Sequence, residues 1–377
     1  MILDQPPLWL ILVAFLAALG PLIFIHEFGH YIVGRWFGVG AETFSIGFGR
    51  EVAGWTDRRG TRWKVGWMPM GGYVRFTGDM DPASMGKGLD KLTPEQRARS
   101  FHAKPVWQRF LIVLAGPAAN FLLAIAVFAA FFAAFGAPRT APIVGAVEPT
   151  MVAAEAGLRA GDRILGLNGE EVDDFEEIGR YINLRPDERI ELSYQRGREV
   201  RSATLRVEAV ELADRFGGRS RIGRIGIAGT QPQLVQLTPF QVLPAAVKHT
   251  AETTRAMATG LWQLVTGRRP VSELHGPMKM AQIAGQFASL GFFEFVQLVA
   301  LFSINLGFIN LLPVPMLDGG HLALYTVEAV RRRPLGERAQ DWVFRGGLAA
   351  LVTLFLFTTL NDLHSFGLWE SIGRLMG

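Results

Sequence analysis

Residues 7–33 read PLWLILVAFLAALGPLIFIHEFGHYIV, a long apolar run that ends in two histidines and a glutamate. The run exceeds the roughly 20 residues that a helix needs to cross the hydrocarbon core of a bilayer. Ionisable side chains are costly at that depth and usually mark a functional site. The stretch therefore predicts a membrane-spanning helix that carries chemistry near one end. Its start is acidic and it is longer than the apolar part of a signal peptide, so we expect a retained span.

The composition agrees with an integral membrane protein. Of 377 residues, 49% are hydrophobic and only 19% are charged, against about 25% charged in soluble domains, and the mean hydropathy is +0.23. The absence of cysteine excludes disulfides and thiolate ligands, so any metal site must use histidine and carboxylates. A net charge of +4 alone would also suit nucleic acid. The basic residues flank apolar stretches, which favours a lipid bilayer as partner and excludes nucleic acid.

Three further apolar stretches, at about 110–135, 292–312 and 346–360, are candidate spans, the last of marginal length. Lys and Arg are dense between the first two spans and again between the last two, whereas only Asp4 precedes the first. The positive-inside rule places both connections in the cytoplasm. Residues 136–290 and both termini are then expected outside. The predicted fold is an α-helical polytopic membrane protein of about four spans with an inserted extracytoplasmic domain.

The inserted domain reads as a small α+β unit over residues 141–210. Residues 163–172, RILGLNGEEV, are two apolar runs joined at Asn168-Gly169, a strong hairpin signal. Residues 174–183 place Phe175, Ile178 and Ile182 on one helical face, and 188–207 read as two strands with a turn at Arg196-Gly197. This order and the run AGLRAGDRILGLNGEEV resemble a bacterial, circularly permuted PDZ domain. The resemblance implies a possible peptide ligand, added as a strand to a sheet edge; a spacer without ligand stays an alternative.

The connection that follows, residues 211–291, shows no catalytic constellation. Residues 217–229 read as another strand pair, and 240–265 as an amphipathic helix that can lie on the outer membrane face. His249 and His275 are isolated, so we interpret both as surface or packing residues.

The chemistry is carried by the motif HEFGH. His26 and His30 are four residues apart and share one helix face, so both imidazoles can bind one metal while Glu27 acts as a base toward water. A hydrolytic site needs a third protein ligand. Asp318 is the only acid near the end of the third span, where prolines and glycines break the helix, as is tolerated beside a cavity. We favour Asp318 as that ligand, with helix capping by Asp318 or competition by His321 as alternatives.

Three motifs together resemble the site-2 protease family of intramembrane zinc metalloproteases: HEFGH in the first span, GPAAN (116–120) in the second and NLLPVPMLDGG (310–320) in the third. The resemblance implies one zinc ion held by His26, His30 and Asp318, with Glu27 as general base. It implies cleavage of single-span membrane proteins, such as anti-sigma factors or membrane-tethered regulators, in a bacterial inner membrane. The alternative is a catalytically silent metal-binding scaffold with a peptide-binding PDZ domain. A metal transporter is disfavoured by the few other intramembrane charges.

The resemblance also implies a substrate-binding role for several residues. Asn310 is expected beside the substrate, and Gly116 and Asn120 are expected against the core of the site. From the residues alone, the small side chains of GPAAN permit close helix contact, and Asn120 needs a hydrogen-bond partner in the bilayer. Residues 63–79, WKVGWMPMGGYVRFTGD, read as a β-hairpin. In the family the GGYV stretch dips into the membrane and can pair with extended substrate, which adds the following residues to the substrate-binding set: Gly71, Gly72, Tyr73 and Val74. An ordinary cytoplasmic hairpin stays an alternative.

These inferences divide the chain at the following boundaries. The predicted parts are a first span with the metal motif (1–34), a cytoplasmic loop with the β-hairpin (35–105), an interfacial helix and second span (106–136), the PDZ domain (139–212), a connector with the amphipathic helix (213–290), a third span with LDGG (291–320), a cytoplasmic loop (321–345), a fourth span (346–363) and a tail (364–377). The interfacial helix is expected to start in RSFHAKPVWQRF (99–110).

Overall fold

The computed structural model describes residues 6–78, 93–213, 219–231, 233–267, 276–333 and 336–365. The chain forms two compact units. Unit 1 comprises residues 1–128 and 276–360, and unit 2 comprises residues 129–275 and 361–377. Because the metal motif and LDGG both fall in unit 1, that unit positions the candidate site.

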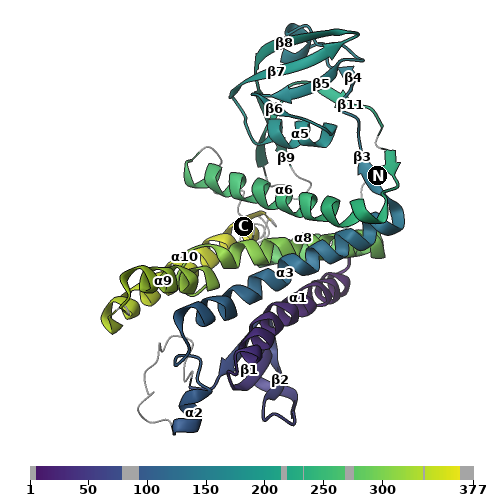
Figure 1. Ribbon diagram of the computed structural model, residues 1–377. Coiled ribbons are helices and arrows are strands. Elements are labelled where there is room, and N and C mark those ends of the chain that lie inside the picture. Colours follow the sequence, from purple (N-terminus) through teal and green to yellow (C-terminus); the bar gives the residue numbers. More distant parts are fainter. Residues whose placement is uncertain are drawn as a thin grey trace, which may run out of the picture. The chain divides into compact units, whose positions relative to one another are not determined.

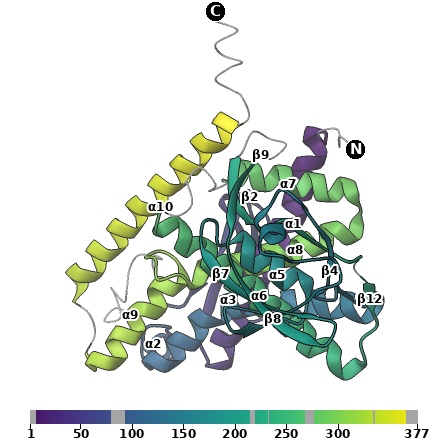
Figure 2. The same ribbon diagram turned by 90° about the horizontal axis from the view of Figure 1, so that it is seen from above.

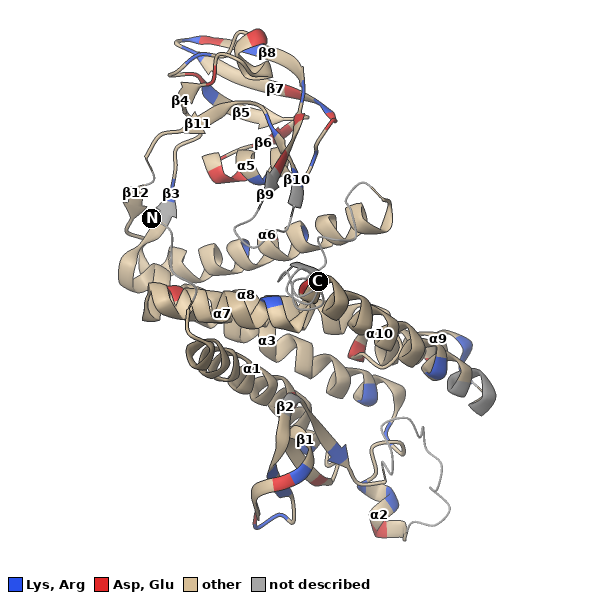
Figure 3. Ribbon diagram, turned by 180° about the vertical axis from the view of Figure 1, so that it is seen from behind, with Lys and Arg blue, Asp and Glu red and all other residues tan. Residues whose placement is uncertain are grey.

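Long apolar helices dominate unit 1 (Figure 1). Four helices of the described residues are long and apolar enough to cross a membrane: Leu8–Trp36 (α1), Val106–Phe135 (α3), Phe292–Leu311 (α8), and Trp342–Leu363 within α10 (Glu337–Ser365). Each of the four predicted apolar stretches is thus helical. Figure 3 shows charged residues gathered on the β1–β2 pair and in the strands of unit 2, while α1 and α3 are nearly free of them.

Small residues bring α1 against α7 (Pro277–Leu290), as Figure 2 also shows from above. A Cβ atom on Gly285 would lie 2.7 Å from a side-chain carbon of Ile11, so only glycine allows this approach. Ala14, Ala284 and Leu298 form the adjoining buried cluster, which ties α1, α7 and α8 together. Close packing of this kind stabilises helices in lipid, where the hydrophobic effect does not drive association.

The strands β1 (Ala41–Thr56) and β2 (Arg62–Phe76) form an antiparallel pair that folds over on itself. Residues 41–46 pair on one side with 62–65 and on the other side with 72–76; Ile46, for example, pairs with both Val65 and Gly72. The hairpin predicted within 63–79 is therefore wrong in its pairing, because its two halves flank residues 41–46 instead of each other. Residues 72–76 become an edge strand that lies beside α1.

One helix boundary differs from the prediction and another agrees with it. The expected loop 321–345 is largely helix α9 (Asp318–Arg331), followed by the start of α10. The helical pattern of α9 was not recognised because it runs into Arg331–Arg333, a run more typical of a loop. The helix predicted over 106–136 begins as expected, and residues 100–105 of the run before it are not helical, in keeping with Pro105, which lacks the N–H that a helix interior requires. Helix α3 begins at Val106 and continues directly into the apolar stretch; a short helix α2 (Pro94–Ala98) precedes it.

Unit 2 is built on a four-stranded antiparallel sheet with the order β6-β5-β7-β8 (Figure 1). The bounds are Arg163–Leu167 (β5), Glu170–Glu171 (β6), Arg189–Arg196 (β7) and Glu199–Arg206 (β8). The hairpin at Asn168-Gly169 is confirmed, since both residues have positive φ angles as a primed turn requires. The second turn falls at Gly197 and Arg198, one residue later than predicted, because Arg196 still pairs with Glu199.

Helix α5 (Phe175–Asn183) covers the core of unit 2 with Ile178 and Ile182, as its pattern predicted. A short helix, α4, spans Val152–Glu155. Outer strands pair in ways that the sequence did not reveal: β10 (Arg219–Arg224) pairs with β9 (Glu208–Ala213), and β11 (Ile227–Gly229) pairs with β4 (Val144–Val147). The strand pair expected within 217–229 is therefore wrong.

The remaining elements of unit 2 are a small strand pair and one long helix. Strands β3 (Ala137–Arg139) and β12 (Gln233–Val235) pair with each other. Helix α6 (Pro239–Val265) confirms the helix predicted over 240–265. His249 on α6 packs edge-on against Phe132 with ring centroids 5.8 Å apart, as expected of a packing residue, and burial lowers its pKa. His275 lies outside the described residues.

One buried ion pair makes the stability of unit 2 depend on pH. Arg196 donates two hydrogen bonds of 2.7 Å to Asp162, whose side chain is only 1% exposed. Burial alone would raise the pKa of Asp162, but the hydrogen bonds from Arg196 and the Arg159 backbone N–H outweigh it and hold the pKa below its usual range. The carboxylate therefore stabilises the fold above its unfolded-state pKa, and this contribution disappears as pH falls through the lowered folded-state pKa.

We expect Asp162→Asn to destabilise unit 2 by about 1.5–3 kcal/mol at neutral pH, the range for hydrogen bonds to a charged group. Hydrogen exchange of the β5 and β7 amides in the detergent-purified chain measures this. The matched control is Glu199→Gln, which breaks an exposed pair with Arg201 and should change protection little. Equal exchange rates in wild type and Asp162→Asn would contradict the assignment.

Candidate metal centre

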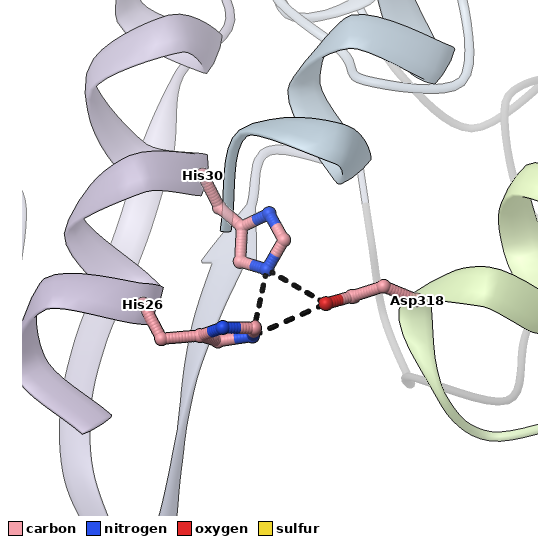
Figure 4. Close-up of side chains that lie close together, drawn as sticks. All are labelled: His26, His30 and Asp318. Carbon is pink, nitrogen blue, oxygen red and sulfur yellow. Dashed lines mark hydrogen bonds and ion pairs between the residues drawn. The ribbon is translucent and has the colours of Figure 1, made fainter. Parts of the chain in front are cut away.

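The two histidines of α1 point toward Asp318 from one turn apart (Figure 4). His26 Nε2 lies 3.1 Å and His30 Nε2 lies 3.5 Å from Asp318 Oδ2, and the two Nε2 atoms are 3.3 Å apart. Among the described residues, this is the one cluster of at least three His or acidic side chains whose ligand atoms all lie within 4.8 Å. Asp318 is almost 300 positions from the two histidines in the sequence, and the fold brings the three side chains together.

A break between α8 and α9 brings Asp318 to the histidines. Residues 312–317 are not helical, and Met316 has a φ angle of 78°. Gly319 then lets α9 start against the end of α8, since a Cβ atom there would lie 2.2 Å from the Leu312 carbonyl oxygen. Leu317, not Asp318, is the N-cap residue of α9, and it makes no side-chain cap. The capping alternative for Asp318 is therefore wrong.

The donor set fits zinc. Ligand atoms about 2.0–2.1 Å from a tetrahedral zinc ion are separated by about 3.3–3.4 Å, close to the three distances found. Asp318 Oδ2 is buried and lies close to the Nε2 atoms of both histidines. His30 Nε2 carries a lone pair, because the ring proton is used on Nδ1, so two acceptors face each other there, and a cation between the three atoms removes that repulsion. Two imidazoles and one carboxylate leave the open fourth position that catalytic zinc sites keep.

A main-chain carbonyl fixes the orientation of His30. His30 Nδ1 donates a hydrogen bond of 2.9 Å to the carbonyl oxygen of Ile112 on α3. Because a carbonyl can only accept, the proton of the neutral ring is on Nδ1 and the lone pair is on Nε2, directed at the centre. Such partners of metal-binding histidines set the tautomer and the ring orientation.

Glycines allow α1 and α3 to approach closely at this level. A Cβ atom on Gly29 would lie 2.3 Å from the Ala115 carbonyl oxygen, and one on Gly116 would lie 2.3 Å from His30 Nε2. The small residues of GPAAN thus permit close helix contact, as predicted, and Gly116 in particular makes room for a ligand ring.

We therefore expect Gly116→Ala to displace the His30 ring and to lower the zinc content of the purified chain at least about 10-fold. Mutations of residues that hold a metal ligand in place typically weaken metal binding by this much. The matched control is Gly20→Ala, also in a long apolar helix, where a Cβ atom meets nothing within 4 Å. Metal analysis after gel filtration reads out both variants. Full zinc occupancy in Gly116→Ala would show that this contact does not position the ligand.

Glu27 lies beside the centre, at a cavity of about 800 Å³. The cavity is lined by the two histidines, Asp318, Glu27 and the edge strand of β2. Gly72 of that strand packs directly on Glu27, since a Cβ atom there would lie 2.9 Å from Glu27 Cγ. Gly71 has a φ angle of 126°, which glycine adopts far more readily than other residues. A Cβ atom there would also lie 2.6 Å from the Phe48 ring.

The predicted residues are brought together with one exception. The cavity is lined by Gly71, Gly72, Tyr73, Val74 and Asn310. Asn120 does not line the cavity and is fully buried against His26, with its amide nitrogen 3.1 Å from His26 Nδ1. This agrees with its expected position against the core of the site but not with a substrate contact. His321 lines the cavity but is not among the three converging ligands.

Sequence reasoning missed the neighbours that hold the site. The Ile112 carbonyl carries no sequence signal, because any residue supplies one. Arg109 pairs with Glu328 at 2.8 Å and lies over the Tyr325 ring, which joins α3 to α9. Arg109 is one of the basic residues between the first two predicted spans, and its long-range partner could not be deduced from one sequence.

Comparisons with known proteins follow this geometry. The sequence model of peptidase family M50 matches residues 14–354. A protein of Agrobacterium fabrum named "Putative zinc metalloprotease Atu1380" is 41% identical over 360 residues, covering 94% of this chain and 96% of that protein. Metalloprotease MmpA of Caulobacter vibrioides is 36% identical over 392 residues, covering 97% and 98%.

Among solved structures, the PDZ domain of an SdrC-like protein from Listeria monocytogenes matches 23% of this chain and 84% of that chain. The sequence identity is 25% and the TM-score is 0.19.

Two histidines and a glutamate on a long apolar helix, with an aspartate at the start of α9, define a membrane metallopeptidase. The chain belongs to peptidase family M50, the site-2 proteases, and this confirms the resemblance drawn from the three motifs. It is a zinc metalloendopeptidase and a membrane protein.

Proposed function

We propose that the chain hydrolyses peptide bonds within the transmembrane segments of single-span membrane proteins, with zinc held by His26, His30 and Asp318. The observation that carries the proposal is the position of the centre. Its two histidines lie inside α1, an apolar helix long enough to span a bilayer, and its aspartate starts α9, after a six-residue break that follows α8. A site supported by these helices is suited to substrates that are themselves in the membrane.

The chain's own groups supply the proton transfers. Zinc, when bound, acts as a Lewis acid that activates water and polarises a carbonyl. Glu27 takes a proton from the attacking water and passes it to the leaving amine as the peptide bond breaks. Its side chain is buried and lines the cavity, next to the position that the attacking water must occupy.

Substrate is proposed to bind along the edge strand of β2. A transmembrane helix hides its carbonyls in its own hydrogen bonds, so it must unwind before a bond can be cut. Within the part of the chain that the structure describes, residues 72–76 pair with 41–46 on one side only, and a strand edge without a neighbouring strand can bind extended peptide by main-chain hydrogen bonds. Tyr73 and Val74 of this strand and Asn310 of α8 face the same cavity as Glu27.

The membrane orientation is likewise a proposal. The connections 35–105 and 321–345 carry the dense Lys and Arg residues, which supports a cytoplasmic location for both. Unit 2 and both termini are then extracytoplasmic in a bacterial inner membrane. The proposed substrates include membrane-tethered regulators such as anti-sigma factors, and a peptide ligand of unit 2 stays a prediction.

Mapping the cut site tests the proposal. Purified chain in liposomes is incubated with single-span proteins, and mass spectrometry locates the new termini. We expect cuts inside the apolar segment, with faster cutting when a Gly-Pro pair loosens that helix. Cuts confined to soluble flanking regions would contradict intramembrane proteolysis, even with zinc fully bound.

A further inference from the structure

Asn120 contacts a proposed metal ligand from the side opposite the metal. Its side chain is fully buried on α3, and its amide nitrogen Nδ2 lies 3.1 Å from His26 Nδ1. The carboxamide oxygen Oδ1 is buried and has no hydrogen-bond partner among the described residues. A buried acceptor without a donor is costly, so this orientation of the amide leaves one hydrogen bond unmade.

The contact also sets the protonation of His26, in a sense opposite to His30. An amide nitrogen can only donate, so in this orientation His26 Nδ1 accepts and the ring proton is on Nε2. That proton points at Asp318 Oδ2, 3.1 Å away. The arrangement is self-consistent for a site without metal. It is unsuitable for a metal ligand, because the lone pair of Nε2 must then face the ion.

Rotation of the carboxamide by about 180° resolves the conflict over His26 and gives Oδ1 a donor, while the amide nitrogen moves to the buried position that has no partner among the described residues. The two ends of the amide have the same shape, so the rotation moves Oδ1 next to His26 Nδ1 without repacking. Oδ1 then accepts a hydrogen bond from Nδ1–H, and Nε2 presents its lone pair to the metal. Both histidines now donate from Nδ1 to an oxygen on α3, as the Ile112 carbonyl already does for His30.

We propose that Asn120 is a positioning residue whose carboxamide oxygen accepts from His26 Nδ1–H when metal is bound, and whose amide nitrogen donates to Nδ1 when it is not. The proposal rests on the proposed metal site. The backbone of Asn120 is fixed independently, because Ser303 on α8 donates a hydrogen bond of 2.8 Å to its carbonyl oxygen. Only the side-chain amide therefore has to turn.

Metal affinity of the full chain in detergent tests the proposal. We compare wild type, Asn120→Leu, Asn120→Asp and Ser303→Ala by chelator competition for zinc and by the visible absorption of the cobalt-substituted site. Asn120→Leu keeps the shape but loses the acceptor, and should weaken zinc binding about 10–100-fold. Asn120→Asp keeps an acceptor, and should bind zinc at least as tightly as wild type with an unchanged cobalt spectrum. Ser303→Ala removes only the hydrogen bond to the Asn120 backbone carbonyl. It is the control for a general loss of packing around Asn120, and its zinc affinity should stay within about 3-fold of that of wild type, well short of the loss expected for Asn120→Leu.

Two results would overturn the inference. Wild-type affinity in Asn120→Leu would show that the acceptor is not used. A loss in Asn120→Asp as large as that in Asn120→Leu would show that only the donor or the packing matters. Failure of the wild-type chain itself to bind zinc would overturn the metal site and the inference together, so the two failures are distinct.

Discussion

Replacing Glu27 by glutamine is expected to leave zinc bound and to lower the cleavage of a co-expressed single-span substrate by about 10²–10⁴-fold, the contribution typical of a general acid–base group. Glutamine has nearly the same shape, so the packing of Gly72 on this side chain is kept. It cannot accept the proton from water at neutral pH. Immunoblots of the substrate, with metal analysis of the same purified protein, measure both quantities.

The matched control for this change is Glu51→Gln. Glu51 is also an acid of unit 1, but it pairs with Arg62 at the surface and does not line the cavity. Its replacement should leave cleavage within a few-fold of wild type, since it touches no reacting group and an exposed ion pair contributes little to stability. Cleavage that survives Glu27→Gln at the wild-type rate would exclude Glu27 as the base and, with it, the proposed mechanism.

Replacing Asp318 by alanine is expected to lower zinc affinity by more than about 100-fold, beyond the usual cost of losing a residue that merely supports a ligand. The change removes one of three converging ligand atoms, and two imidazoles alone are fewer than the three protein ligands of catalytic zinc sites. Cleavage should be lost with the metal. Chelator competition on the purified chain gives the affinity.

His321→Ala is the control for that prediction. His321 follows Asp318 by one turn on α9 and lines the same cavity, and it was the competing ligand in the sequence. We expect the His321→Ala protein to retain zinc. If instead Asp318→Ala kept its zinc and His321→Ala lost it, the third ligand would have been assigned to the wrong residue.

The part of the site that follows a fixed local geometry was predictable. Four-residue spacing places His26 and His30 on one face of any helix, and the apolar flanks identify that helix as a span. Asp318 could be proposed because it is the only acid near the end of α8, where two prolines interrupt the helix. In each case a short stretch of sequence contains the physical reason for the structure.

What could not be predicted depends on partners distant in sequence. Strand 72–76 was assigned to a local hairpin, but the bend of β1 places it beside residues 41–46. Strand β10 was paired with its neighbour β11, although β9 and β4 are the actual partners. The position of Asn120 behind His26, and not in the cavity, depends on how α1 and α3 cross, which Gly29 and Gly116 permit but which no single motif specifies.

X-ray absorption at the zinc edge of the purified wild-type chain tests the metal centre most directly. For the wild-type chain, the three converging atoms predict a shell of nitrogen and oxygen at about 2.0–2.1 Å from zinc, with the multiple-scattering pattern of two imidazoles. If the His26→Ala protein retains zinc, its spectrum should show one imidazole instead of two. A shell without imidazole scattering, or a spectrum unchanged by His26→Ala, would show that the metal is bound elsewhere.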